Sequence, residues 1–326
     1  MSLKSLIKKI DFEKYGSLIA FIVLFVISSF ASPYFLQLQN ILNILRQVSY
    51  TGIIALGMTF VIIGGGIDLS VGSMTALVGG ISILSLNSAM NFFGYGYWNE
   101  IMAIIVAVIV SIALGAAFGS LNGVAITKGR IPPFIVTLGT MAIYRSLALY
   151  IGKAGVFTSN SYMYPELGMG YFLGVPIPVW VFFVMAFLFH IILNWTRYGR
   201  YICAVGSNQK VARYSGIKVD FVRFMSYVIV GITVGVSAVF LTSRLNSISS
   251  TNGGSGYELD AIAAVIIGGT PMTGGSGTIF GTVIGAIILG MINNMLNMLG
   301  ISPYLQGTVK GIVIIGAVLI QRKRTQ

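Results

Sequence analysis

The sequence is almost free of the residues from which catalytic and metal sites are built. Its 326 residues include one cysteine, Cys203, one histidine, His190, and 8 acidic residues. A single cysteine excludes an internal disulfide and a multi-cysteine metal site. His190 lies in an apolar run, where a packed histidine is more common than a ligand. We therefore expect no catalytic residues, no metal site and no cofactor.

Charge is scarce as well. Only 9% of the residues are charged, 56% are hydrophobic and the mean hydropathy is +0.90, whereas a soluble domain carries about 25% charged residues. With 41 glycines spread along the chain, this composition predicts an all-α polytopic membrane protein. The first apolar segment, about 16–31, lacks a small-x-small cleavage site before a polar domain, so we interpret it as a retained helix.

The basic residues are grouped between the apolar segments. The positive-inside rule places such groups in the cytoplasm, so we expect both termini to be cytoplasmic in a cell-membrane protein. The net charge of +12 then reflects the orientation of the chain in the membrane. It does not indicate nucleic-acid binding, which would need a basic face on a soluble module. The groups comprise Lys4, Lys8, Lys9 and Lys14; Lys128 and Arg130; Arg197, Arg200, Lys210, Arg213, Lys218 and Arg223; and Arg322, Lys323 and Arg324.

The apolar segments predict about ten transmembrane helices in a single domain, 1–326, at about 20 residues per crossing. An even number keeps the turn at 128–130 and the loop at about 196–223 on the same side as both termini. That loop separates a first half, about 1–195, from a second half, about 224–326. The eighth segment is short, so it is either tilted and partly buried or wrongly bounded. The segments are about 16–31, 49–63, 67–86, 100–127, 133–151, 178–195, 223–243, 260–268, 277–299 and 304–320.

One phrase occurs twice: VIIGG stands at residues 61–65 and again at 265–269. Each copy ends an apolar stretch and opens a Gly/Ser-rich break. Paired breaks are typical of duplicated transporters with discontinuous helices near their pathway. Five spans per half would invert the second copy, giving a five-plus-five pseudo-repeat. The alternative is chance similarity combined with close helix packing. The glycines assigned to the breaks are Gly64, Gly65, Gly66, Gly268, Gly269, Gly274 and Gly275.

Polar residues inside the spans mark candidate functional positions, because they are costly in a membrane. Asp68, with Ser70 beside it, follows the first break and is either an N-cap or a residue bordering a pathway. Arg244 is expected to pair with Glu258 or Asp260 rather than to contact a solute. Amides on the outer approach and on one later helix can join helices or bind a polyhydroxyl solute. These amides are Asn43, Gln47, Asn293 and Asn297.

The cytoplasmic loop predicts a short capped helix at about 207–215. Ser207 or Asn208 can cap its start, and Gly216 can end it in a left-handed conformation. Such a helix on the inner face suits docking to a partner, with Ala212 facing into the partner and Arg213 and Ser215 beside it. The chain has no G-x-x-x-x-G-K-[ST] phosphate loop, so we expect any ATP hydrolysis on a separate polypeptide.

Two long runs resemble one family. The run GMTFVIIGGGIDLSVGS at 57–73 and the run YELDAIAAVIIGGT at 257–270 are similar to permease subunits of sugar ABC importers of the ribose, galactose, arabinose and xylose group. The loop at 196–217 resembles that family's cytoplasmic coupling segment. The C-terminal run NNMLNMLG at 293–300, with Lys310-Gly311, is closest to the ribose branch. The resemblance covers essentially the whole chain.

The resemblance implies ATP-driven import of a monosaccharide by a dimeric membrane core. It implies a cytoplasmic ATP-binding subunit, an extracytoplasmic sugar-binding protein and a second permease copy, identical or related, as partners. Two alternatives stay open. A permease for nucleosides or branched-chain amino acids would share this architecture, and an ion-coupled secondary transporter would need intramembrane carboxylates beyond Asp68.

Overall fold

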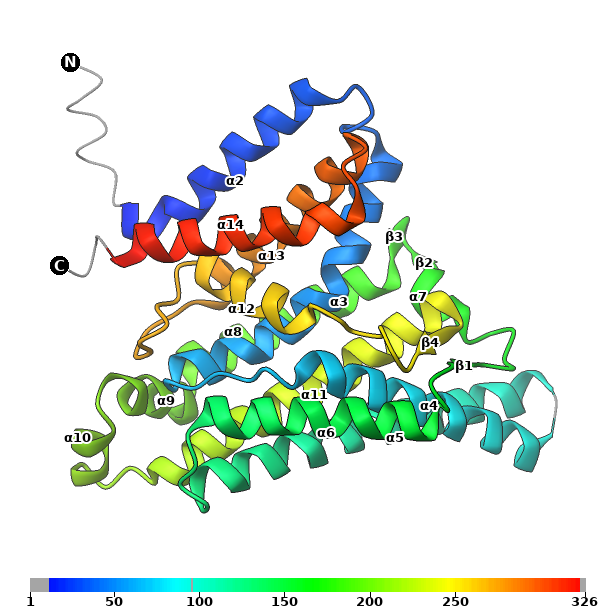
Figure 1. Cartoon of the computed structure of the whole chain (residues 1–326), viewed down its shortest axis with the longest axis horizontal. Coiled ribbons are helices and arrows are strands. Elements are labelled where there is room, and N and C mark those ends of the chain that lie inside the picture. The colour runs from blue at the N-terminus through cyan, green and yellow to red at the C-terminus, as the bar shows by residue number, and fades with distance from the viewer. Residues whose placement is uncertain (1–11, 95, 323–326) are drawn as a thin grey trace.

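The computed structural model describes residues 12–94 and 96–322 as a set of packed helices (Figure 1). Each predicted span corresponds to a helix, and the all-α class is confirmed. Seven of the described helices are long and apolar enough to cross a membrane: α3, α4, α5, α6, α8, α11 and α13. The helices that match the ten predicted spans are α2 (Phe12–Ala31), α3 (Leu38–Ile63), α4 (Val71–Phe93), α5 (Tyr97–Thr127), α6 (Pro133–Ile151), α8 (Ile177–Trp195), α11 (Val219–Leu245), α12 (Tyr257–Ile267), α13 (Ile279–Met298) and α14 (Pro303–Arg322).

Helix α12 explains the short eighth segment. It has 11 residues, which at about 1.5 Å per residue is too short to cross a bilayer core of about 30 Å. Its residues from Ala261 to Ile266 are all buried. Helix α12 is therefore a short, buried helix packed between α3 and α13, and it begins at Tyr257 rather than at the predicted residue 260.

Helix α3 starts at Leu38, well before the predicted residue 49. The missed first turns carry polar side chains that interrupt the apolar pattern, and two of these side chains make contacts with distant residues. Asn40 exchanges side-chain hydrogen bonds with Asn294 of α13 at 3.2 and 2.8 Å. The guanidinium carbon of Arg46 lies 4.9 Å from the centre of the Tyr171 ring. These tertiary contacts make a polar helix start tolerable.

The remaining elements are short and lie in the connections. Two small antiparallel ribbons form, one pairing β1 with β4 and one pairing β2 with β3. In the first ribbon Val156 faces Ser249, which ties a loop of the first half to a loop of the second. The short elements are β1 (Val156–Thr158), α7 (Pro165–Met169), β2 (Tyr171–Phe172), β3 (Val175–Pro176), α9 (Arg197–Ser207), α10 (Gln209–Tyr214) and β4 (Ser247–Ser249).

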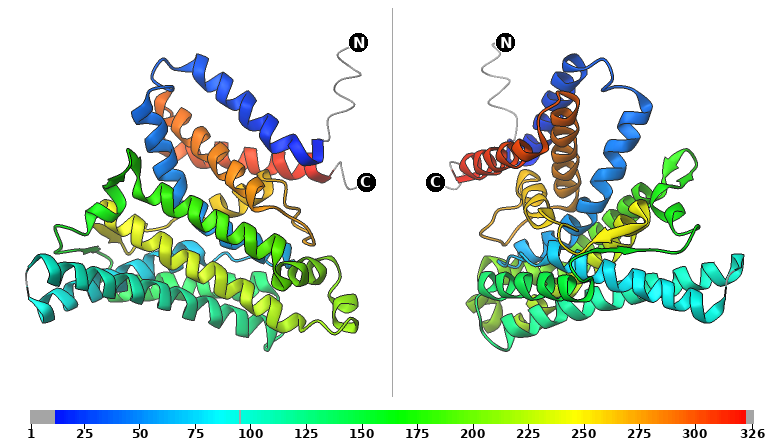
Figure 2. Two further views of the ribbon diagram at one scale, coloured as in Figure 1. Left: turned by 180° about the vertical axis from the view of Figure 1, so that it is seen from behind. Right: turned by 45° about the vertical axis from the view of Figure 1, so that its right-hand side comes forward.

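The helices form two groups joined by α3. Helices α4, α5, α6 and α11 lie in one layer, while α2, α13 and α14 lie on the other side of α3 (Figures 1 and 2). Helices α5 and α11 cross closely at the point where Gly115 and Gly231 meet. A Cβ atom on either glycine would overlap the carbonyl oxygen of the other. Small residues at such a crossing let two backbones approach closely.

One end of the molecule gathers the segments that carry basic residues. The start of α2, the end of α14, the α5–α6 turn and helices α9 and α10 all lie toward the same end (left in Figure 1; right in the first view of Figure 2). The two ribbons and the α4–α5 turn lie toward the opposite end. The charge pattern in the sequence thus corresponds to a spatial separation between the two ends.

Candidate functional site

The two copies of VIIGG form the same helix end. In the first, Gly65 has φ +74° and donates to Ile62, while Gly66 donates to Val61 at 2.9 Å. In the second, Gly269 has φ +95° and donates to Ile266, while Thr270 donates to Val265 at 3.2 Å. Both patterns are Schellman motifs, in which a left-handed residue satisfies the last helical carbonyls. The repeat in the sequence is therefore also a repeat in structure at these positions.

The two breaks touch each other and α9. The backbone N–H of Gly275 donates to the carbonyl oxygen of Ile63, the last residue of α3, at 2.8 Å. The α9 residue Gly206 packs against that same oxygen so closely that a Cβ would overlap it. We call this three-way contact the break junction, defined by Ile63, Gly206 and Gly275. It links both glycine breaks to the loop predicted to be cytoplasmic.

Asp68 organises the chain just after the first break. Its carboxylate accepts from the backbone N–H of Ser70 at 2.8 Å and from the Ser70 hydroxyl at 2.6 Å. Asn122 of α5 donates to the same carboxylate at 3.3 Å. The N-cap interpretation of Asp68 is wrong, because α4 starts at Val71 and Asp68 binds the residue before that start rather than an N–H inside the helix. Asp68 instead joins the first break to α5.

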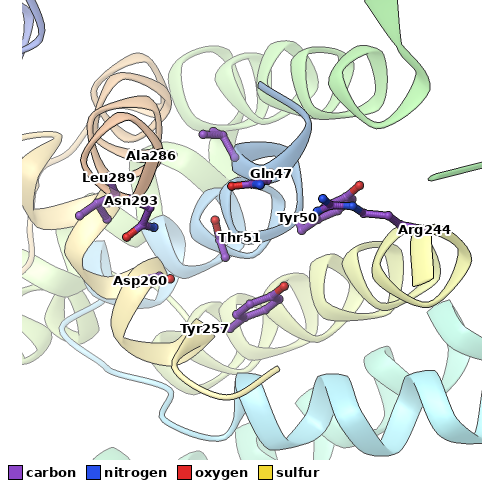
Figure 3. Close-up of a pocket in the computed structure, with 12 residues that line it drawn as sticks. Gln47, Tyr50, Thr51, Arg244, Tyr257, Asp260, Ala286, Leu289 and Asn293 are labelled. Atoms are coloured by element: carbon purple, nitrogen blue, oxygen red, sulfur yellow. The ribbon is translucent and has the colours of Figure 1, made fainter. Parts of the chain in front are cut away.

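A polar cavity of about 210 Å³ lies between α3, α11, α12 and α13. Its walls combine aromatic, charged and amide side chains with small and aliphatic ones (Figure 3). Space of this size holds several waters or a small polar molecule. The polar wall is made by Gln47, Tyr50 and Thr51 of α3, Arg244 of α11, Tyr257 and Asp260 of α12, and Asn293 of α13.

The charges around the cavity are arranged differently from the predicted pairing. Asp260 forms a salt bridge with Lys310 of α14, with Nζ 2.9 Å from Oδ1 and 3.0 Å from Oδ2. Arg244 makes no salt bridge among the described residues, and its guanidinium carbon lies 5.6 Å from the centre of the Tyr50 ring. The prediction that Arg244 pairs with Glu258 or Asp260 was wrong because α14 supplies a closer cation to Asp260.

Two of the four predicted pathway amides meet in this cavity. Gln47 and Asn293 both line it, although they are far apart in sequence. Asn297 lies outside it, one turn further along α13, and accepts a hydrogen bond from Gln306 at 2.7 Å. Asn43 is half-buried and lies outside the cavity lining. Asp68 and Ser70 are fully buried and also lie apart from the cavity.

The aromatic residues of the cavity wall were not among the predicted site residues. Tyr50 and Thr51 stand three and four positions after Gln47, so they share its helix face. That spacing was a usable signal. Tyr257 stands three positions before Asp260 and shares a face with it in the same way. Within the described ranges there is no group of three or more His, Cys, Asp or Glu residues that could hold a metal ion.

The predicted loop helix forms, and it is shorter than expected. Helix α10 spans Gln209–Tyr214, and the Asn208 side chain caps it by accepting from the N–H groups of Lys210 and Val211 at 3.0 and 3.1 Å. Gly216 follows with φ +81°, as the left-handed ending requires. Ser207 belongs to the preceding helix α9 and is not the cap.

The exposed face of α10 differs from the prediction. Ala212 is 3% exposed and packs into the core of this chain, so its predicted contact with a partner was wrong. Val211 is 58% and Tyr214 91% exposed. Arg213 is also exposed and pairs with Asp220 at 3.2 Å. In α9, burial raises the pKa of the Cys203 thiol.

Comparisons with known proteins agree along nearly the whole chain. A family described as branched-chain amino acid transport system / permease component matches residues 40–318. The ribose import permease protein of Escherichia coli K12 is 43% identical over 312 residues, covering 94% of this chain and 93% of that protein. The ribose import permease protein of Bacillus subtilis 168 is 43% identical over 329 residues, covering 98% and 97%. The D-allose transport system permease protein of Escherichia coli K12 is 36% identical over 311 residues, covering 95% and 92%.

Proposed function

This chain belongs to the family of transport-system permease components, and we propose that it is the membrane-spanning permease subunit of an ATP-driven importer of a monosaccharide, a ribose-like pentose or a related simple sugar. The observation that carries the proposal is the similarity, over more than nine-tenths of each chain, to ribose and D-allose permeases. The family description keeps branched-chain amino acids as a second candidate substrate class.

The subunit works with other polypeptides in this proposal. In this proposal ATP is hydrolysed by a separate cytoplasmic ATP-binding subunit, and the lack of a phosphate-loop motif in the sequence supports this. An extracytoplasmic sugar-binding protein delivers the substrate, and a second permease copy completes the membrane core. The end that carries α9, α10 and the α5–α6 turn is cytoplasmic, because the basic segments gather there.

Helix α10 is the proposed docking element for the ATP-binding subunit. Its outward residues Val211 and Tyr214 form an apolar tip, and Arg213 stands at the rim. The caps at Asn208 and Gly216, with Ser207 and Ser215 beside them, hold this short helix in shape. Ala212 anchors it from the inside. The break junction then connects the docking element to both glycine breaks, which we propose border the route together with Asp68 and Ser70.

The proposed route starts at the opposite end. Gln47 and Asn293 contact the solute in the cavity, and Asn43 and Asn297 lie along the approach on the same two helices. About 16 residues separate Gln47 from Ile63, so the cavity lies roughly 24 Å along α3 from the break junction at 1.5 Å per residue. The proposed solute position is therefore well separated from the break junction and the cytoplasmic end of the molecule.

Uptake by cells tests the proposal. A strain lacking this chain, and the same strain carrying it with its ATP-binding and binding-protein partners, are given labelled ribose, allose, arabinose and xylose, and separately leucine, valine and a nucleoside. Accumulation of a sugar only when all partners and ATP are present is the expected result. Accumulation of leucine or valine instead would replace the sugar assignment with the second candidate.

A further inference from the structure

The cavity wall contains a polar group to which no described residue donates a hydrogen bond. The Oδ1 atom of Asn293 is buried and has no hydrogen-bond partner among the described residues. Buried polar groups are almost always hydrogen-bonded in proteins, so an unpaired buried acceptor is unusual. Asn293 is also one of the residues that line the cavity.

We propose that this cavity, in a single copy of the chain, is a weak binding site for a neutral polyhydroxyl solute, with Asp260 and Asn293 as its main acceptors of hydroxyl hydrogen bonds. The proposal rests on the proposed sugar-import function and deepens it. It assigns a binding step to the permease itself, separate from any recognition by a partner protein.

The ion pair prepares Asp260 for this role. A carboxylate offers about four lone-pair positions, and Lys310 approaches both oxygens from α14 at 2.9 and 3.0 Å. Lys310 thereby compensates the charge of Asp260 and occupies only part of the acceptor capacity of this cavity-lining carboxylate. An anionic solute would be repelled by this carboxylate, whereas the hydroxyl group of a neutral solute would donate a hydrogen bond to it.

The other side chains of the cavity wall also suit a sugar, because they combine hydrogen-bonding groups with aromatic rings. Gln47 and Asn293 each carry an amide that both donates and accepts, and Arg244 adds a donor. Tyr50 and Tyr257 line the same space with their rings (Figure 3). A site with a few fixed polar groups between apolar and aromatic surfaces orients a small ligand. Transport requires binding weak enough to allow release, so we expect low affinity.

The test is cysteine protection in the purified full-length permease without ATP or partners. In a Cys203→Ser background, Ala286→Cys, on the α13 side of the cavity, is labelled with a small methanethiosulfonate reagent while ribose is added. At three times the Kd the labelling rate should fall about fourfold, because only that fraction of sites stays empty. Phe280→Cys is the control, since Phe280 is an exposed residue of α13 outside the cavity lining, and its rate should not change.

Labelling at a second position shows whether the result depends on a structural effect of the first cysteine substitution. Thr51→Cys lies on the α3 side of the same cavity and should be protected by ribose over the same concentration range. Leucine should protect neither position, and the sugar acid ribonate should protect less than ribose. Equal rates with and without ribose at both positions, or stronger protection by ribonate, would overturn the proposal. Protection without sugar uptake in cells would keep the site and reject the import function, whereas uptake without protection would do the reverse.

Discussion

The backbone N–H of Gly275 donates to the carbonyl oxygen of Ile63 at 2.8 Å, and this bond joins the second glycine break to the first. Ile63 ends α3, and its carbonyl is not needed by the Schellman motif, whose bonds use Val61 and Ile62. Gly206, near the end of α9, packs on the same oxygen. A displacement of α9 therefore acts on both breaks at one atom.

Gly206→Ala should destabilise the break junction. The added Cβ overlaps the Ile63 oxygen, which is backbone and has little freedom to move, and such overpacking costs about 1–3 kcal/mol. We expect a lower melting temperature in detergent and reduced transport by the assembled importer. Gly139→Ala in α6 is the control, because nothing lies within 4 Å of its Cβ position. Equal melting temperatures and transport for the two variants would show that the junction carries no coupling.

Tyr214→Asp should separate docking from folding. Tyr214 is 91% exposed on α10, so the substitution should leave the permease folded while weakening its association with the ATP-binding subunit. Co-purification of the two subunits and gel filtration of the permease measure these effects. Ala212→Glu is the contrasting variant, since it buries an unpaired charge at a cost of several kcal/mol and should lower the yield of folded protein. Full co-purification with Tyr214→Asp would place the docking surface elsewhere.

Features set by local sequence were predictable. The repeated VIIGG phrase located both helix ends, since a left-handed glycine after an apolar run specifies a Schellman ending without help from the rest of the chain. Asn208 and Gly216 likewise bounded α10 from its own sequence. Seven of the described helices are also long and apolar enough to be recognised as membrane spans from composition.

Features set by distant partners were not predictable in the same way. Which cation reaches Asp260 depends on the path of α14, which brings Lys310 to it from 50 positions away. The early start of α3 depends on the exchange between Asn40 and Asn294. The burial of Ala212 depends on the packing of α10 against its own chain. In each case a tertiary contact overrode the local pattern.

Asp68→Ala should destabilise the segment after the first break. The change removes the acceptor for the Ser70 N–H and hydroxyl and for Asn122, all of them buried. Leaving a buried donor unpaired costs about 1–3 kcal/mol, so the melting temperature should fall markedly. Asp68→Asn keeps an acceptor oxygen for the Ser70 N–H and should fall less. If the two variants melt together at the wild-type temperature, the network does not stabilise the break.

Cys203 should react slowly with maleimide at neutral pH. Burial raises the pKa of its thiol, and because the thiolate is the reactive form, a raised pKa leaves less of it at pH 7. The labelling rate of the folded permease should therefore keep increasing at a pH where labelling of the denatured chain has levelled off. A profile identical to that of the denatured protein would contradict this, and measurements from pH 7 to 10 would decide.

The Asp260–Lys310 pair should show coupling in a double-mutant cycle. The side chains are 13% and 26% exposed, so the pair is neither free in water nor fully desolvated, and we expect a coupling of about 1 kcal/mol. Asp260→Asn leaves the ammonium without its counter-charge, and Lys310→Gln leaves the carboxylate without its own. The double variant replaces the ion pair with two amides that can hydrogen-bond, so it should lose less stability than the two single losses added together. Melting temperatures of the four proteins in one detergent give the cycle. Additive losses would mean that Lys310 does not hold Asp260, and the carboxylate would then face the cavity without charge compensation.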